Sequence, residues 1–222
     1  MTNEKRYIAF FDLDRTVLGM NSGYALGRSA YKAGLINRSD LINALFLALL
    51  YKLKLRSAEK MITGMGSWLR GLTIETVSDL AERSVDEYLI KSVFQGFRDE
   101  LLLHNSQNAH TAFLTSAISE ICNPLSLKLG VRNIICTEME CINGIYTGLP
   151  AGNYCYGPEK ARRMKEFCMK NGIDLLSSYY YADSISDLPA LETAGNPVCV
   201  NPESTLEKIA LKRGWRITYW KR

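Results

Sequence analysis

The stretch YIAFFDLDRT, from Tyr7 to Thr16, determines how the rest of the chain is interpreted. Its continuous apolar run is typical of a strand buried on both faces of a parallel sheet. Asp12 and Asp14 follow two positions apart, and an extended chain places such side chains on the same side. Carboxylates held close together repel each other, which raises the pKa of one of them. The pattern therefore predicts a site that offsets their charge.

The composition is that of an ordinary globular protein. The 222 residues are 47% hydrophobic and 23% charged, with a net charge of +4 and no dense block of Lys and Arg to bind nucleic acid. The N-terminus is too polar, and then too acidic, for a secretory signal. Six scattered cysteines without a Cys-x-x-Cys pair favour free thiols. We expect a cytoplasmic protein that binds no nucleic acid.

The most apolar segment is LINALFLALLYKLKL, from Leu41 to Leu55. It is interrupted by Asn43, Lys52 and Lys54, and it is shorter than the ~20 residues that cross a bilayer. We therefore expect no stable membrane insertion. An amphipathic helix here could contact a lipid surface, although such a stripe more often packs one helix against its neighbours.

The order of the predicted elements indicates an α/β fold. Only helical signals occur from about residue 21 to residue 104, and strands then alternate with helices. The predicted strands after this region include TAFLTS (Thr111–Ser116), RNIICT (Arg132–Thr137), SYYYADS (Ser178–Ser184) and NPVCV (Asn196–Val200). Such alternation predicts a parallel sheet covered by helices on both faces. We expect a Rossmann-like three-layer α/β/α core domain, residues 1–18 and 106–222, with a helical cap domain, residues 19–105, inserted after the first strand.

Polar residues lie where the predicted strands end, which is where parallel α/β sheets form their sites. These residues are Asp12, Asp14, Thr16, Ser116, Asp183 and Asp187, and Lys160 begins a predicted helix. Each aspartate or hydroxyl alone is explained as a turn or a helix cap. Lys160 opposes the helix dipole, at a cost of up to ~1 kcal/mol, unless an anion binds there.

Together these residues predict chemistry on a phosphoryl group. Mg²⁺ prefers hard oxygen ligands and is usually held by one or two carboxylates with phosphate oxygens. The hydroxyls of Thr16 and Ser116 and the ammonium of Lys160 are donors suited to an oxyanion. Carboxylates, hydroxyls and a lysine in this combination are typical of phosphoryl transfer.

The sequence resembles the haloacid dehalogenase-like phosphatases. FDLDRT, the serine of LTSA, the lysine of GPEK and the aspartates of ADSISD are similar to the four motifs of that family, in its order. The helical insert resembles its C1-type cap, and the most similar branch is that of the phosphoserine phosphatase-like hydrolases. One departure is Ala182, where the family usually has glycine.

The resemblance implies a role for each matching residue. Asp12 would be the nucleophile that becomes an aspartyl-phosphate, and Asp14 would protonate the leaving oxygen and then accept a proton from water. Thr16, Ser116 and Lys160 would hold phosphate oxygens, and Lys160 would also offset charge in the transition state.

The resemblance also implies Mg²⁺ as the cofactor. Its protein ligands would be Asp12, Asp183 and the backbone carbonyl of Asp14. Asp187 would orient Lys160 or a metal-bound water. The expected activity is Mg²⁺-dependent hydrolysis of a small phosphorylated metabolite, a phosphomonoester.

Three alternatives stay open at this point. In the first, the substrate would be a lipid phosphate of the lysophosphatidate or phosphatidylglycerophosphate type. In the second, the chain would be a non-catalytic phospho-acceptor or binding module. A receiver domain also clusters aspartates with Thr/Ser and Lys around Mg²⁺, but its acidic pair and phospho-acceptor lie on different strands and it lacks a large helical insert.

One position predicts that free phosphoserine is a poor substrate. In phosphoserine phosphatases a glutamate a few residues beyond the first motif helps to bind the amino acid, and here Asn21 lies near that place. A neutral amide cannot pair with an ammonium group as a carboxylate does. Apolar cap residues (Leu45, Phe46, Leu49, Leu50 and Trp68) favour either cap packing or a larger, partly apolar phosphomonoester.

Overall fold

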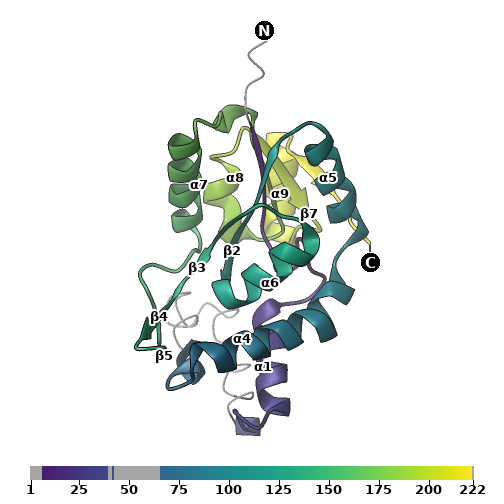
Figure 1. The fold of residues 1–222 in the computed structure, drawn as a ribbon. Coiled ribbons are helices and arrows are strands. Elements are labelled where there is room, and N and C mark those ends of the chain that lie inside the picture. The colour runs from purple at the N-terminus through teal and green to yellow at the C-terminus, as the bar shows by residue number, and fades with distance from the viewer. Residues whose placement is uncertain (1–6, 40–41, 43–65, 222) are drawn as a thin grey trace.

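The computed structural model describes residues 7–39, 42 and 66–221. Its centre is a sheet in the order β3-β2-β1-β6-β7-β8, in which neighbouring strands are parallel (Figure 1). The strands are β1 (Ile8–Phe11), β2 (His110–Ile118), β3 (Asn133–Thr137), β6 (Tyr179–Ala182), β7 (Asn196–Val200) and β8 (Arg216–Thr218). The predicted parallel sheet is confirmed, and β1 lies inside it, between β2 and β6.

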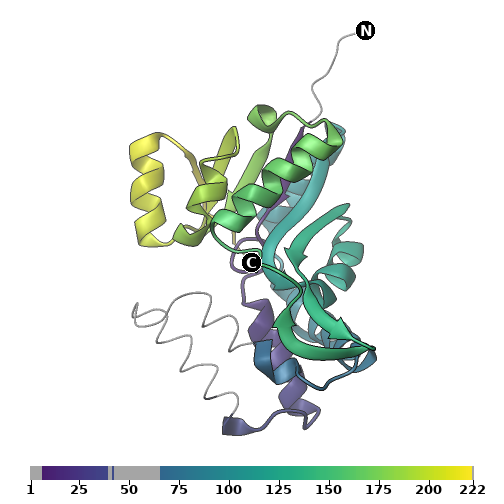
Figure 2. The ribbon, with the colours of Figure 1, turned by 90° about the vertical axis from the view of Figure 1, so that its left-hand side faces the viewer.

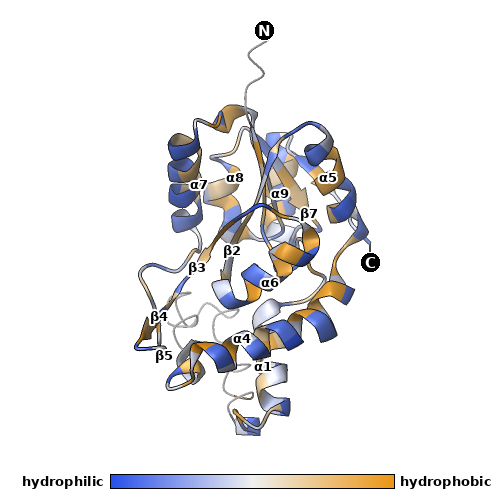
Figure 3. Cartoon of the chain, viewed as in Figure 1, coloured by the Kyte–Doolittle hydropathy of each residue, from blue (hydrophilic) through white to orange (hydrophobic). Residues whose placement is uncertain are grey.

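Helices cover both faces of this sheet, as predicted. These are α5 (Gln95–Ser106), α6 (Ser119–Leu129), α7 (Pro158–Asn171), α8 (Leu188–Leu191) and α9 (Ser204–Arg213). Side chains of β1 alternate between two buried clusters: Phe11 packs with α5 and α6, whereas Phe10 packs with α7, α8 and α9. Figure 3 shows hydrophobic colour along the strands and alternating colours along the covering helices, as expected for amphipathic helices against a sheet.

The described residues between β1 and β2 form helices only, as the sequence predicts. They are α1 (Ser22–Lys32), a 3₁₀ turn (Ser67–Leu69), α4 (Ile74–Ser84), a π-helical turn (Val85–Leu89) and α5 after a further 3₁₀ turn (Ile90–Ser92). The segment Leu41–Leu55 lies outside the described residues except for Ile42, which is exposed.

The amphipathic pattern of α4 explains its burial in the middle of the helix but not at its start. Val77, Leu80 and Ala81 are buried, whereas Ile74, the first residue of the helix, is 49% exposed. The helix also widens into the π turn after Ser84 rather than continuing as one regular stripe.

Residues 139–150 form a separate two-stranded antiparallel sheet, a hairpin made of β4 (Met139–Ile142) and β5 (Ile145–Pro150). Asn143 and Gly144 both have positive φ, 52° and 81°, as a two-residue hairpin turn requires. Figure 2 shows the hairpin at the level of the cap helices rather than within the main sheet.

Backbone hydrogen bonds join this hairpin to the cap. The Gly71 amide donates to the Tyr146 carbonyl at 2.9 Å, the Tyr146 amide donates to the Leu72 carbonyl at 2.9 Å, and the Ile74 amide donates to the Gly144 carbonyl at 3.1 Å. We call these paired segments, residues 71–74 and 144–146, the cap–hairpin seam. They connect two parts of the chain that are about seventy residues apart in sequence.

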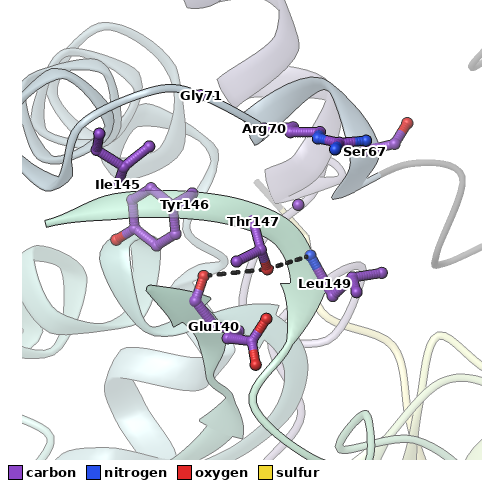
Figure 4. Close-up of a pocket in the computed structure, with 9 residues that line it drawn as sticks. Ser67, Arg70, Gly71, Glu140, Ile145, Tyr146, Thr147 and Leu149 are labelled. Carbon is purple, nitrogen blue, oxygen red and sulfur yellow. Dashed lines mark hydrogen bonds between the residues drawn. The ribbon is translucent and has the colours of Figure 1, made fainter. Parts of the chain in front are cut away.

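A cavity of about 570 Å³ opens beside the seam (Figure 4). It is lined by Ser67, Arg70, Gly71, Glu140, Ile145, Tyr146, Thr147, Gly148 and Leu149. In its wall, the Thr147 hydroxyl donates to the Glu140 carbonyl at 3.5 Å and accepts from the Leu149 amide at 3.2 Å. The Tyr146 hydroxyl donates to Glu120 of α6. The cavity thus lies against elements that bridge the cap and the core.

Across the ranges that the structure describes, none of the helices has the length and apolar character needed to cross a bilayer.

Candidate active site

The end of β1 places Asp12 at the centre of the sheet's carboxyl edge. Its amide donates to the Tyr181 carbonyl of β6 at 2.9 Å, and Asp12 is buried. The chain then turns, because the amides of Val17 and Leu18 both donate to the Leu13 carbonyl, at 3.0 and 2.9 Å. This turn returns the fully buried Thr16 toward the same edge.

The end of β6 supplies the neighbouring carboxylates. Asp183 follows the strand directly, and Asp187 ends the 3₁₀ turn Ile185–Asp187. The Thr16 hydroxyl donates to Asp183 Oδ1 at 3.3 Å. The side chain that caps the turn is Ser184, which accepts from the Ser186 amide. Capping therefore does not explain the two aspartates, both of which are buried.

Asp12, Asp183 and Asp187 form a buried acidic triad. Each offers one carboxylate oxygen, and these three oxygens lie within 4.8 Å of one another. Hard carboxylate oxygens converging at this spacing suit a divalent cation such as Mg²⁺. The donor set in this part of the chain therefore fits the cofactor that the sequence predicts.

Lys160 lies inside the triad, in the first turn of α7 after Gly157 and Pro158. It is 3% exposed, and its Nζ lies 2.6 Å from Asp12 Oδ1 and 2.6 Å from Asp187 Oδ1. Burial disfavours the ammonium, but the two carboxylates outweigh burial and hold the pKa of Lys160 well above its usual value. The negative charges of these carboxylates offset the unfavourable interaction between the Lys160 ammonium and the positive end of the helix dipole.

One lysine does not neutralise three buried carboxylates. Burial raises the pKa of Asp12 to about 7, although Lys160 acts to lower it. Burial also raises the pKa of Asp183 to about 8, and the negative charges of Asp12 and Asp187 add to this effect. The triad therefore has room for further positive charge, which a divalent cation supplies.

Asp14 does not join the triad, because β1 ends at Phe11 and the alternation of an extended strand does not reach position 14. Its carboxylate instead accepts from the Ser22 amide at 2.7 Å and from Asn21 Nδ2 at 2.8 Å, at the start of α1. Burial raises the pKa of Asp14, and the hydrogen bond from Ser22 opposes that shift. Asp14 nevertheless lies near enough to Asp12 for its charge to raise the Asp12 pKa, so the predicted repulsion between the two aspartates is present.

Ser116 also lies apart from the bonded cluster. It is inside β2, which continues to Ile118 and shifts its register against β3 between Leu114 and Ile118. Its carbonyl accepts from the Thr137 hydroxyl at 3.0 Å. The residue before α6 is Ile118, so the simpler interpretation of Ser116 as a helix cap is wrong.

Tyr180 is a site residue that sequence reasoning missed. Its hydroxyl donates to Asp187 Oδ1 at 2.6 Å and lies 3.1 Å from Lys160 Nζ. A tyrosine in an apolar strand is ordinarily assigned to the core. The available signal was the alternation of β6, which directs Tyr180 and Ala182 to the face that α7 covers.

Comparison with known proteins places the chain in a family. Residues 9–192 match the profile of the haloacid dehalogenase-like hydrolases. A probable phosphatase of Mycobacterium tuberculosis is 31% identical over 220 residues, which cover 98% of this chain and 76% of the relative. A histidinol-phosphatase of Neisseria meningitidis is 28% identical over 220 residues, covering 96% of this chain and 99% of the relative.

A solved structure shares the fold. A phospho-aspartyl intermediate analogue of phosphoserine phosphatase superposes with a TM-score of 0.72 at 17% identity, covering 99% of this chain and 95% of that one. The shared architecture includes the helical region inserted after β1. The chain belongs to the haloacid dehalogenase-like hydrolases, and it is a phosphatase of the phosphoserine phosphatase-like branch of that family.

Proposed function

We propose that the chain is a Mg²⁺-dependent phosphomonoester hydrolase that forms an aspartyl-phosphate on Asp12 and acts on a small phosphorylated metabolite. The observation that carries this proposal is the buried Asp12 carboxylate, 2.6 Å from Lys160 within a triad suited to a cation. Bound Mg²⁺ would offset the charge that the phosphoryl group brings to this site.

In the first step an Asp12 oxygen forms a bond to phosphorus, and the bond from phosphorus to the substrate's leaving oxygen breaks. Lys160 fixes the Asp12 carboxylate through Oδ1 and offsets the charge of the phosphoryl oxygens. Thr16 and Ser116 are the proposed donors to those oxygens. Asp14 gives its proton to the leaving oxygen, so that the product departs as a neutral alcohol.

In the second step water attacks phosphorus, and Asp14 accepts the proton of that water. The bond between Asp12 and phosphorus breaks, which releases inorganic phosphate and restores both carboxyl groups. The present hydrogen bonds of Asp14 to Ser22 and Asn21 link this residue to the start of α1. The position of α1 therefore sets the orientation of the Asp14 carboxyl group for proton transfer.

Two observations support a small substrate other than free phosphoserine. The histidinol-phosphatase relative matches the chain over nearly its whole length. Both polar groups of the Asn21 side chain are already engaged, since Nδ2 donates to Asp14 and Oδ1 accepts from the Tyr24 amide at 2.9 Å. Asn21 therefore lacks the charge that pairs with an ammonium group, and its amide is already oriented by Asp14 and the Tyr24 amide.

The lipid-phosphate alternative rests on apolar cap residues. Four of them, Leu45, Phe46, Leu49 and Leu50, lie outside the described residues. The fifth, Trp68, packs against both the main core cluster and the smaller cluster at the hairpin. Trp68 thus serves cap packing, and a small phosphomonoester is the better supported class.

The test is hydrolysis of p-nitrophenyl phosphate with and without Mg²⁺, followed by a phosphometabolite panel. We expect wild-type activity that a chelator abolishes, and an Asp12→Asn variant that binds inorganic phosphate but does not turn over. Free phosphoserine should have a low kcat/KM relative to the best compound of the panel. Asp12→Asn activity within a few-fold of wild type would refute the mechanism.

A further inference from the structure

Tyr180 is fully buried beside Lys160, on the α7 side of the main sheet. Its ring centroid lies 5.9 Å from Lys160 Nζ, and its hydroxyl oxygen lies 3.1 Å from the same atom. The same hydroxyl is 2.6 Å from Asp187 Oδ1. Tyr180 therefore contacts both partners of the Lys160–Asp187 ion pair.

The directions of these hydrogen bonds are fixed by chemistry. An ammonium group has three donors and no acceptor. Lys160 directs them to Asp12 Oδ1, Asp187 Oδ1 and the Tyr180 oxygen. The single proton of the Tyr180 hydroxyl goes to Asp187, so its oxygen accepts from Lys160. Lys160, Tyr180 and Asp187 thus form a closed ring of hydrogen bonds.

A full set of partners on Lys160 has a consequence for substrate binding. A phosphoryl oxygen can accept a hydrogen bond from Lys160 only if Lys160 first breaks its hydrogen bond to one of its three present acceptors. The bonds to the two carboxylates are short ion pairs, at 2.6 Å each, whereas the bond to the neutral phenol is 3.1 Å long. Both partners are charged in the two ion pairs, but only the donor is charged in the bond to the phenol. The phenol is therefore the acceptor displaced at least cost.

We propose that Tyr180 is a positioning residue of the hydrolase, an assignment that rests on the function proposed above. In the substrate-free enzyme its hydroxyl aligns the Lys160 ammonium on Asp12. When substrate binds, the hydrogen bond from Lys160 to the Tyr180 oxygen breaks, and the same Lys160 N–H then donates to the phosphoryl oxygen. Throughout this exchange the hydroxyl keeps its bond to Asp187, which leaves Asp187 aligned with Lys160.

The chain offers a matched control in the next residue of β6. Tyr181 is also fully buried, but it faces the α5 side of the sheet, where its hydroxyl donates to Glu100 at 2.7 Å and lies 2.8 Å from His104 Nε2. Tyr181→Phe removes a buried hydroxyl of the same kind without removing a side-chain contact to the triad. Tyr180→Phe keeps the ring beside Lys160 and removes only the oxygen.

The experiment compares both variants, with Mg²⁺, for p-nitrophenyl phosphate turnover and for calorimetric binding of inorganic phosphate. In Tyr180→Phe, kcat should fall about tenfold because Asp187, which aligns Lys160, loses the hydrogen bond from the Tyr180 hydroxyl that persists with bound substrate. That factor is the equivalent of one buried hydrogen bond to a charged group. Phosphate should bind several-fold more tightly, because it no longer displaces the phenol. Tyr181→Phe should retain the wild-type kcat and phosphate affinity.

A spectroscopic measurement is independent of turnover. In protein labelled with ¹⁵N-lysine, the Lys160 ammonium signal should shift in Tyr180→Phe and stay in place in Tyr181→Phe. If Tyr180→Phe does not fold, the signal of the Tyr180 hydroxyl proton in wild-type protein should shift when phosphate is added, because the Tyr180 oxygen then no longer accepts from Lys160.

The outcomes separate the two proposals. An inactive wild-type enzyme would refute the proposed function. An active wild type with equal effects of Tyr180→Phe and Tyr181→Phe, weaker phosphate binding in Tyr180→Phe, or a Tyr180 hydroxyl signal that does not shift when phosphate binds would each overturn the role of Tyr180.

Discussion

Asp183 is the triad residue that bonds to a hydroxyl rather than to Lys160. Lys160 bonds to Asp12 and Asp187, while the neighbour of Asp183 is the neutral hydroxyl of Thr16. Burial raises the pKa of Asp183 to about 8. Above pH 8 we therefore expect Asp183→Asn to raise the free energy of unfolding of the metal-free protein by on the order of 1 kcal/mol, because it removes a buried negative charge beside Asp12 and Asp187. Urea unfolding in the presence of a chelator measures this change.

The same variant tests whether the triad binds the metal. A ligand that binds only the native state stabilises it, so Mg²⁺ should raise the melting temperature of wild-type protein. This increase should be largely absent in Asp183→Asn. Equal Mg²⁺ stabilisation of both proteins would exclude Asp183 as a ligand.

Asn21 is predicted to support Asp14 through its amide. Asn21→Asp keeps the helix cap, because its carboxylate still accepts from the Tyr24 amide. It replaces the donor to Asp14 with a negative oxygen, so kcat should fall about tenfold, as for a group that loses its alignment for proton transfer. Asn21→Ser keeps the cap without the charge and should have an intermediate kcat; equal kcat in all three proteins would contradict this role.

Most of the site follows from sequence, and the exceptions have local causes. Asp12, Thr16, Lys160, Asp183 and Asp187 converge because parallel strands end at one edge. The orientation of Asp14 depends on where β1 stops, and strand ends are set by tertiary pairing rather than by residue type. The catalytic and metal-binding roles of these site residues stay predictions, which the experiments above test.

At the scale of elements, the hairpin approaches the segment 67–70 closely at Gly148, next to the cap–hairpin seam. This glycine has a φ of 81°, and a Cβ there would lie 3.1 Å from both Arg70 Cβ and the Ser67 carbonyl oxygen. We expect Gly148→Ala to destabilise the protein by about 1–3 kcal/mol through backbone strain and this contact. Denaturant unfolding gives the value.

Gly144 provides the matched control for that variant. It has the same φ of 81°, but a Cβ there meets nothing within 4 Å. Gly144→Ala therefore reports backbone strain alone, and the excess destabilisation in Gly148→Ala reports the contact with the cap. Equal losses in the two variants would show that the seam tolerates a methyl group.

Elements with strong local signals were predictable, whereas their partners were not. The turn at Asn143 and Gly144 identifies the hairpin from sequence. Its pairing with residues 71–74 left no such trace, because backbone hydrogen bonds do not depend on side-chain identity. The boundary between a core at residues 1–18 and 106–222 and a cap at residues 19–105 stays a proposal, and the hairpin qualifies it by bonding to the cap.

Across the whole molecule, His104 makes stability depend on pH. It is buried, with Nδ1 3.1 Å from the Tyr7 hydroxyl and Nε2 2.8 Å from the Tyr181 hydroxyl. Burial lowers the pKa of His104 below its usual value of about 6.5, Glu100 opposes this shift and Arg216 adds to it. The unfolded chain therefore binds this proton more readily, and the contribution of His104 to the free energy of unfolding should fall as the pH drops below about 6.5. The raised pKa values of Asp12 and Asp183 act in the opposite direction.

Urea unfolding between pH 8 and pH 5 measures this dependence. His104→Gln should be less stable than wild type at pH 8, and this difference should narrow toward pH 5, because the variant has no imidazole to protonate. His110→Gln controls for the loss of an imidazole elsewhere in the chain. A difference that stays constant from pH 8 to pH 5 would assign the pH dependence to other groups.

The cap–hairpin seam also limits how this architecture can be recombined. A chimaera that receives residues 19–105 from a relative would keep a native hairpin whose Gly144 carbonyl and Tyr146 backbone groups face a foreign segment. Transplanting residues 139–150 together with the cap keeps those hydrogen bonds within one parent. The unit of modular exchange is therefore discontinuous, made of two stretches of chain that are inherited together.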